Sequence, residues 1–341
     1  MDERAFGEPA GRGAIRARPE HFRVVEQLGY EPTGSGEHLW LEVEKRGLNT
    51  LDVASRLAEC AGVPLRAVGF AGLKDRNALT RQPFTIQLPG VADPDVSGWS
   101  DDRINIVSVT RHQRKIQRGR LSGNRFELVV TELEAERSRL EQRLREIAER
   151  GVPNGFGEQR FGGNNVARAY RLFRGELRRS PSKRKRGFYL SAARSLIFNR
   201  VLAARIEDRT WDRVLEGDLV MLDGTRSTFA VEAVDEEIER RAREQDLHPT
   251  GPMVGRGETG VGGRAAELES AVIDAHRELV EGLERFGLEA DRRPLRMRVR
   301  RLEWSFDSED RLRLSFELGA GCYATAVLRE ALEYRDASHD L

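Results

Sequence analysis

The sequence predicts an α+β fold built around a largely antiparallel sheet. Strand-like segments occur as hairpin-like pairs, and helical segments lie between these pairs rather than after every strand. The glycine-rich stretch 251–265 lacks the strand–GxGxxG–helix context of a dinucleotide site, and the chain contains no GxxxxGK[ST] motif. Both observations favour antiparallel pairing over a doubly wound parallel sheet. With 341 residues, the chain is long enough for two domains.

The elements of the first half follow from apolar periodicity. Apolar residues at helical spacing predict a helix over 50–61, with Thr50 as its N-cap. A long charged helix is predicted over 132–150. The runs rich in β-branched and aromatic residues predict strands over 23–28, 38–46, 67–73, 83–88, 104–111 and 125–133.

Gly151, Pro153 and Gly155 predict a boundary after the long charged helix. Beyond it, 189–206 is a strongly amphipathic helix, and 218–223 is a strand that enters a small β unit. The glycine-rich stretch 251–265 is expected to be a loop. A helix over 265–287, two strands over 297–307 and 311–318, and a final helix over 324–334 complete the predicted elements.

Composition excludes several classes of protein. Two cysteines, Cys60 and Cys322, are too few for a disulfide scaffold or a cysteine-rich zinc site. The six histidines are scattered without an HExxH motif, so no metal is expected. No apolar run approaches the ~18 residues that span a bilayer, and no secretory signal is readable at the N-terminus. We therefore expect a cytoplasmic protein with no membrane partner and no nucleotide cofactor.

The formal net charge of +1 conceals three basic stretches. Segment 111–125 has six basic residues and no acid, 168–186 has nine against the single Glu176, and 292–301 has six arginines and no acid. Polyanion binding depends on such local fields rather than on total charge. Each stretch alone is also typical of a solvated face. The excess of arginine over lysine fits either phosphate contact or a GC-rich genome.

The densest polar loop between apolar segments is 69–84. It contains Asp75 between Lys74 and Arg76, and opposite charges keep a carboxylate ionised. An ionised carboxylate can act as a nucleophile or a base. A surface turn with a charged cluster is the commoner interpretation of this pattern taken alone.

The same loop, Gly69-Phe70-Ala71-Gly72-Leu73-Lys74-Asp75-Arg76, resembles the signature of the TruD family of tRNA pseudouridine synthases. Further blocks resemble this family in order over nearly the whole chain. They are Pro19–Glu26, Gly34–Leu39 with Glu44–Arg46, Arg114–Ile116 with Leu121–Phe126, Gly151–Asn154 with Phe156–Gly162, Ser191–Ser195 with Phe198-Asn199, Arg293–Leu295, and Gly319–Thr325. Departures from the family pattern occur at His21, Asn77, Pro83 and Gly155.

The resemblance implies a pseudouridine synthase core with an antiparallel sheet, interrupted by an inserted α/β TRUD domain. The expected core is 1–153 joined with 297–341, and the expected insertion is 154–296. The implied reaction converts a uridine of tRNA, at position 13, into pseudouridine. The N1–C1′ bond breaks, the ring turns and a C5–C1′ bond forms, with no cofactor, metal or energy source.

The resemblance also implies roles for individual residues. Asp75 is the essential catalytic aspartate and acts on a flipped-out base. Asn124 contacts the target nucleotide, and the aromatic rings of Phe22, Phe126 and Tyr323 lie near the site, where core packing is the alternative. Of Lys74 and Arg76, one is expected to pair with Asp75 and the other to face RNA phosphate. Arg16 is either a phosphate or aspartate contact or a free surface arginine, whereas no catalytic role is expected for His112.

Two other functions compete with this interpretation. A non-catalytic RNA-binding protein on the same fold would keep the basic stretches but would not need Asp75. A metal-dependent hydrolase would need two or three clustered acids, and the motif loop contains one. Activity on tRNA in the presence of EDTA discriminates these alternatives.

Overall fold

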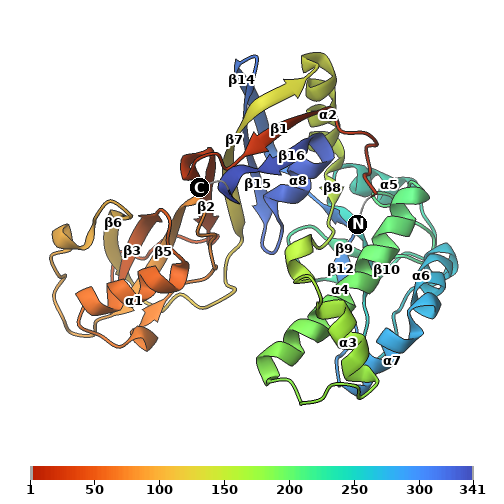
Figure 1. Ribbon diagram of the computed structural model, residues 1–341, viewed down its shortest axis with the longest axis horizontal. Coiled ribbons are helices and arrows are strands. Elements are labelled where there is room, and N and C mark those ends of the chain that lie inside the picture. Colours follow the sequence, from red (N-terminus) through yellow and green to blue (C-terminus); the bar gives the residue numbers. More distant parts are fainter. Residues whose placement is uncertain (1–2, 340–341) are drawn as a thin grey trace. The chain divides into compact units, whose positions relative to one another are not determined.

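The computed structural model of the protein describes residues 3–339, and these form two compact units. The first, the sheet unit, comprises residues 9–144, 299–324 and 331–339. The second, the helical unit, comprises residues 3–8, 145–298 and 325–330. Figure 1 shows helices and strands in both units, so the predicted α+β class is confirmed.

The sheet unit is organised by one ten-stranded sheet with the order β14-β15-β7-β2-β5-β3-β6. β1 pairs with β7 and β16, and β4 pairs with β5. All pairs are antiparallel except β2 with β5 and β1 with β16. The strands are β1 Gly11–Ile15, β2 Phe22–Gln27, β3 His38–Lys45, β4 Val68–Gly69, β5 Leu79–Gln87, β6 Ile104–His112, β7 Gly123–Ala135, β14 Arg300–Ser308, β15 Arg311–Gly319 and β16 Glu333–Asp336.

Helix α1 (Thr50–Cys60) covers one end of this sheet (Figure 1). Its apolar residues, among them Val53 and Leu57, pack on Leu41 of β3 and Phe84 of β5. The N-cap is Asn49 and not Thr50, because Asn49 and Asp52 form a capping box. The Thr50 hydroxyl is thereby left free for contacts with the neighbouring loop.

Strand β4 is shorter than the predicted strand 67–73, since the chain leaves the sheet after Gly69. A side chain at Gly69 would come within 2.5 Å of the Ile116 carbonyl oxygen and the Thr85 hydroxyl. This close approach explains why glycine is needed there. Residues 70–78 then form an irregular loop that returns to β5.

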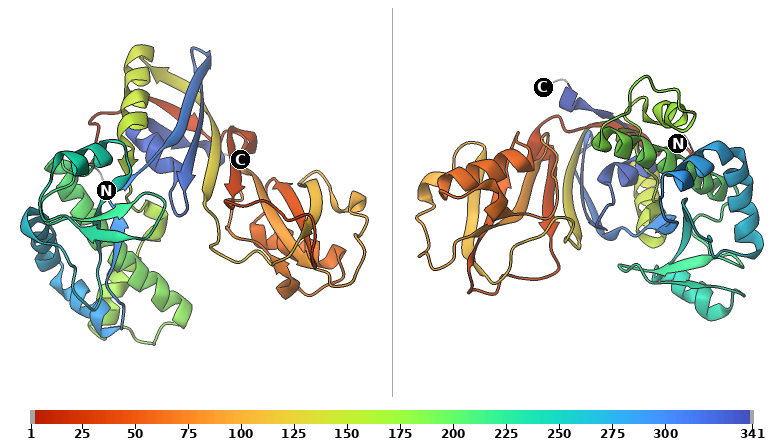
Figure 2. Two further views of the ribbon diagram at one scale, coloured as in Figure 1. Left: turned by 180° about the vertical axis from the view of Figure 1, so that it is seen from behind. Right: turned by 90° about the horizontal axis from the view of Figure 1, so that it is seen from below.

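The helical unit contains the four-stranded sheet β10-β9-β11-β12 and the strand pair β13-β8. Buried side chains of α3, α4 and α7 form an apolar cluster in this unit. Figure 2 shows its strands and helices from two further sides. The strands are β8 Val152–Pro153, β9 Leu219–Leu222, β10 Thr228–Ala230, β11 Leu247–Met253, β12 Asp291–Pro294 and β13 Arg296–Met297. The helices are α3 Asn165–Phe173, α4 Lys183–Glu207, α5 Glu236–Arg243, α6 Gly263–Ala275 and α7 Arg277–Arg285.

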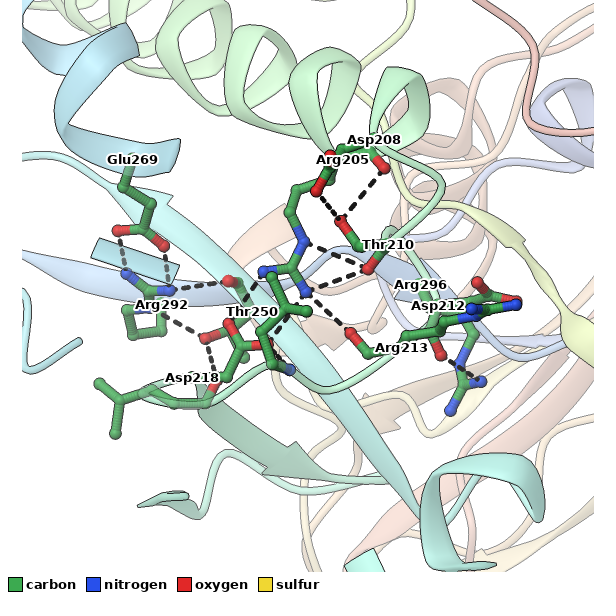
Figure 3. Close-up of polar contacts among 12 residues, drawn as sticks. Arg205, Asp208, Thr210, Asp212, Arg213, Asp218, Thr250, Glu269, Arg292 and Arg296 are labelled. Carbon is green, nitrogen blue, oxygen red and sulfur yellow. Dashed lines mark hydrogen bonds and ion pairs between the residues drawn. The ribbon is translucent and has the colours of Figure 1, made fainter. Parts of the chain in front are cut away.

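Two arginines of the third basic stretch, Arg292 and Arg296, have their partners inside the helical unit. Arg292 makes a two-pronged ion pair with Glu269, at 2.6 and 2.8 Å (Figure 3). Arg296 is buried and donates to the carbonyl oxygens of Ala242 and Leu247. Neither polyanion contact nor a solvated face therefore describes these two arginines, because their guanidinium groups satisfy internal acceptors.

A second buried ion pair in the same unit connects helix α4 to the turn before β9. Arg205 reaches both carboxylate oxygens of Asp218, at 3.1 and 2.9 Å, and both side chains are nearly inaccessible (Figure 3). Arg205 also donates to the carbonyl oxygens of Thr210 and Arg213. A buried charge of this kind requires all of its partners to be in place.

Several other predicted boundaries differ from the structure. The predicted helix 265–287 is two helices, α6 and α7, separated at His276, whose backbone leaves the helical region. Strand β11 extends into the predicted glycine-rich loop. The predicted C-terminal helix ends early as α8 (Ala324–Ala331), and the chain then pairs as β16.

Helix α2 (Arg137–Arg150) begins after β7, which extends into the range predicted as helix. Within the described residues, none of the helices is both long and apolar enough to cross a membrane.

Candidate active site

Asp75 lies in the loop between β4 and β5, with its carboxylate two-fifths exposed to solvent. The Asn77 amide N–H donates to Asp75 Oδ1 at 3.0 Å, which fixes a tight turn. The Lys45 ammonium donates to the Asp75 backbone carbonyl at 2.8 Å. The loop therefore presents a carboxylate that is held in place and still open to a ligand.

The cation beside this carboxylate is Arg16. Its Nη2 lies 3.3 Å from Asp75 Oδ2, while its Nη1 donates to Asp336 Oδ2 at 2.5 Å. The Arg16 side chain is 9% exposed, and its guanidinium carbon lies 3.9 Å from the centroid of the Phe22 ring. Of the alternatives for Arg16, the structure selects the aspartate contact. A guanidinium with two carboxylate partners and an aromatic support keeps a fixed orientation.

Asp336 of β16 anchors this arrangement from the other end of the chain. Burial acts to raise the pKa of Asp336, but hydrogen bonds from Ser338 and the nearby Arg16 charge hold it below its usual value. Asp336 therefore stays ionised and orients Arg16 toward Asp75. No signal within the Asp75 motif points to Asp336, so sequence reasoning missed it.

Lys45, at the end of β3, is buried below the loop. Burial lowers the pKa of Lys45 to about 8, although the charge of Asp75 opposes this change. The ammonium is still protonated at neutral pH and adds positive charge beside the loop. Lys45 falls within a block that resembles the TruD family, but the sequence alone assigned it no role.

Lys74 points away from Asp75, although the two are adjacent in the chain. Its Nζ lies 2.6 Å from Glu26 Oε2 and donates to Asn124 Oδ1 at 2.5 Å. Glu26 and Asn124 are cross-strand partners on β2 and β7, which brings both side chains to one place. Burial lowers the pKa of Lys74, and the Glu26 carboxylate opposes that change. Lys74 therefore connects the motif loop to the sheet.

Neither Lys74 nor Arg76 forms an ion pair with Asp75 in the part of the chain that the structure describes. The expectation that one of them does is therefore wrong. Lys74 is directed to Glu26, and the exposed Arg76 donates to the Gly47 carbonyl at 3.3 Å. In this loop, successive residues point in different directions, so adjacency in sequence does not imply contact.

Further hydrogen bonds fix the loop from α1 and β5. The Thr50 hydroxyl accepts from the Lys74 amide N–H at 2.8 Å and donates to Gln82 Oε1 at 3.0 Å. Gln82 Nε2 donates in turn to the Gly72 carbonyl at 3.2 Å. A side chain at Gly72 would collide with the Glu26 carboxylate, so only glycine leaves room for the buried ion pair.

The predicted aromatic residues differ in exposure. Phe22 and Phe126 are buried and in edge contact, with ring centroids 6.3 Å apart. Phe126 also stacks on Phe316, its cross-strand partner on β15, at 5.5 Å. Tyr323, by contrast, is 46% exposed just before α8. Of these three residues, Tyr323 has the large exposed ring area, whereas the two phenylalanines pack within the sheet unit.

A family model described as tRNA pseudouridine synthase D (TruD) matches residues 3–177 and 164–331. The chain belongs to the TruD family.

Close relatives cover almost the full length of the chain. It is 47% identical to tRNA pseudouridine synthase D of Methylococcus capsulatus over 97% of this chain and 94% of that protein. It is 49% identical to the protein of the same name from Ectopseudomonas mendocina, over 98% and 95%. The fold also matches a crystal structure of a TruD protein from Methanosarcina mazei, with a TM-score of 0.78 at 22% identity, over 97% and 96%. The resemblance inferred from the sequence blocks is thereby confirmed.

In this member of the TruD family, Lys74 and Asn124 meet at Glu26, and Asp75 is held through its backbone by Lys45. Neither Glu26 nor Lys45 had an assigned role. Glu26 and Lys45 both lie in blocks that resemble the family, and this resemblance is the sequence feature that could have identified them as site residues. His112 stacks with Tyr30 and accepts the Thr33 amide N–H at 3.2 Å, so its contacts are with neighbouring turns.

Proposed function

We propose that this protein is a tRNA pseudouridine synthase that isomerises a uridine within tRNA, at position 13, with Asp75 as the essential catalytic carboxylate. The observation that carries the proposal is a solvent-open Asp75 whose partner Arg16 is itself fixed by Asp336, in a chain of the TruD family. The reaction is balanced without a co-reactant, since the N1–C1′ bond is replaced by a C5–C1′ bond, N1 gains a proton and C5 loses one.

In this proposal each residue of the site has a separate role. Asp75 acts as nucleophile or base toward the extruded nucleotide, and its ion pair with Arg16 holds the carboxylate in place. Asn124 reads the uracil edge through its amide, which has both donor and acceptor. Its Oδ1 already accepts from Lys74, so Lys74 sets the orientation of the amide. Tyr323 has an exposed ring, and in this proposal that ring stacks on a base of the RNA.

The expected division into core segments 1–153 and 297–341 with an insertion at 154–296 is part of the proposal. The catalytic residues all lie in the first and last of these ranges. The basic stretches 111–125 and 168–186 carry exposed arginines and lysines that would contact phosphates of the RNA. We place the reaction in the cytoplasm, where tRNA is available as the partner.

The test is to map pseudouridine in tRNA from cells with and without this protein, and in a tRNA transcript treated with purified protein and EDTA. We expect one tRNA position to lose pseudouridine in the cells without the protein, and the same position to gain it in the transcript. A transcript that is bound but remains unmodified would instead support a non-catalytic RNA-binding protein. Activity abolished by EDTA would support a metal-dependent enzyme.

Replacing Asn124 by alanine should reduce the rate much more than tRNA binding. A lost edge contact in a desolvated pocket costs ~1–3 kcal/mol, or roughly 5- to 150-fold in rate. Most tRNA affinity comes from distributed phosphate contacts, which remain. Single-turnover rates and dissociation constants on the same samples measure both effects. Asn105→Ala, at an exposed asparagine of β6, is the matched control. Equal losses of binding and rate for Asn124→Ala would contradict base recognition.

Replacing Arg114, Arg118 and Arg120 together by glutamine should weaken tRNA binding and reduce its dependence on salt. All three side chains are exposed in the first basic stretch. Each lost phosphate contact lowers the slope of log K against log salt by roughly 0.7–0.9. The measurement is the dissociation constant at several salt concentrations.

The control for this triple variant removes the same charge elsewhere in the sheet unit. It replaces Arg301, Arg311 and Arg313, two of which pair with Glu317 and Asp307. We expect a much smaller change in salt slope for the control. Equal slopes for both triple variants would show that the first basic stretch is a solvated face.

A further inference from the structure

Tyr30 is an exposed aromatic residue on a rigid support. It is 44% exposed, although it belongs to the turn that follows β2. Its ring stacks on that of His112 with centroids 5.7 Å apart and an interplanar angle of 21°. Trp40 meets Tyr30 edge-on at 6.1 Å and His112 at 5.2 Å. An exposed ring supported in this way loses little conformational entropy when another flat group stacks on it.

The support is fixed by strands and not by loops alone. His112 is the last residue of β6, and its Nδ1 accepts the Thr33 amide N–H at 3.2 Å. Trp40 belongs to β3, is buried, and packs with Ala71 and Ile116. Ala71 lies in the same loop as Asp75, four residues earlier. The aromatic cluster therefore shares its packing with the catalytic loop.

Positive charge adjoins this cluster. Residues 113–122 connect β6 to β7, and the Gly119 amide N–H donates to the Ala71 carbonyl at 3.0 Å. The connection carries exposed Arg114, Arg118 and Arg120, of which Arg120 is close enough to Tyr30 to act on its hydroxyl. Glu31 and Glu37 are the exposed acids of the turn that contains Tyr30. Arg114 lies close enough to His112 to act on that ring, and Arg118 lies over the ring of Phe70, 4.4 Å from its centroid. An exposed ring with guanidinium groups on the neighbouring segment suits a base with its flanking phosphates.

We propose that Tyr30 is a stacking platform for an unpaired base of the RNA substrate, distinct from the uridine that is extruded toward Asp75. The stacked Tyr30 and His112 rings, packed through Trp40 against the catalytic loop, carry the proposal together with the three exposed arginines. It deepens the proposed function, on which the identity of the RNA as tRNA rests. A base held there would fix the register of the RNA strand relative to Asp75.

The test measures tRNA binding and salt dependence for Tyr30→Ala, Tyr30→Leu and Tyr30→Phe in the full chain. Stacking on an aromatic ring is sequence-tolerant and needs the π-face, so we expect the alanine and leucine variants to bind roughly 5- to 150-fold more weakly. The phenylalanine variant should bind like the wild type. All four proteins should keep the same salt slope, because no phosphate contact is removed.

Two controls separate stacking from folding. Phe286→Ala removes an exposed ring of the helical unit that lies outside the basic stretches, and it should leave tRNA binding unchanged. Melting temperatures show whether loss of Tyr30 disturbs Trp40, and the leucine variant retains apolar bulk if the alanine variant unfolds. A folded leucine variant with wild-type affinity would overturn the proposal, and so would a phenylalanine variant as weak as leucine.

Failure of the proposed function can be distinguished from failure of the Tyr30 proposal by measuring pseudouridine formation and tRNA binding separately. If the wild-type protein forms no pseudouridine, the catalytic proposal fails, while the difference between leucine and phenylalanine in binding still decides the role of Tyr30. If the wild-type protein is active and the Tyr30 variants bind tRNA equally well, only the stacking platform is overturned.

Discussion

Asp75→Asn should abolish pseudouridine formation while leaving folding and tRNA binding nearly unchanged. The amide has the size of the carboxylate but is neither a nucleophile nor a base, so the rate should fall by at least the ~10²–10⁴ expected for loss of a general acid or base. The loop itself should survive, because Lys45 binds the backbone carbonyl of residue 75 and an asparagine side-chain oxygen can still accept the Asn77 N–H.

The measurement is single-turnover pseudouridine formation, with tRNA affinity and melting temperature on the same preparation. Asp235→Asn is the matched control, since Asp235 is an exposed acid that caps α5 in the helical unit, whereas Asp75 belongs to the sheet unit. It should lose some stability, about 0.5–2 kcal/mol for a weakened cap, and retain its rate. An Asp75→Asn protein with more than about a hundredth of the wild-type rate would disprove the catalytic role of Asp75.

Lys74→Met should destabilise the protein by about 3–5 kcal/mol, because it leaves the Glu26 carboxylate buried without its cation. The Glu26 side chain is fully buried, and the Lys74 side chain is 6% exposed. The same change removes the donor that orients Asn124, so the rate should fall in addition to the stability. Denaturant unfolding and single-turnover rates measure the two effects.

The double variant Glu26→Gln with Lys74→Met is the control for this prediction. It removes both charges, so most of the stability lost in Lys74→Met should return. The rate should not return, since the donor to Asn124 is still missing. A phosphate-binding Lys74 would behave differently: Lys74→Met would keep the melting temperature, weaken tRNA binding and lower its salt slope.

The sequence predicted which residues belong to the site around Asp75, but not all of their contacts. The motif loop predicted an ionised Asp75, and the family blocks included Glu26, Lys45 and Asn124. The sequence did not predict that Lys74 joins Glu26 and Asn124, because that contact depends on β2 and β7 being neighbours in the sheet. Strand order is a property of the whole chain, and no local pattern encodes it.

The burial of the arginines in the basic stretches also could not be predicted from the sequence. The sequence showed three stretches of similar composition, but the structure distinguishes them. Arg292 and Arg296 satisfy internal acceptors, whereas Arg114 and Arg118 remain exposed. The acceptors for Arg292 and Arg296 lie 23 to 54 residues away in the chain. A count of charges along the chain therefore does not predict these contacts.

By itself the sequence determined the α+β class, the TruD family and the acid of the motif loop. The pattern of strands, the positions of glycines and short motifs are local features, so they can be recognised without knowing which segments are in contact. Only the tertiary structure decided that Arg16 pairs with Asp75 and is held by Asp336, which lies 320 residues away. It also decided that Phe22 and Phe126 are buried and Tyr30 is exposed. Ion pairing and burial depend on distances between segments, and these exist only once the sheet has assembled.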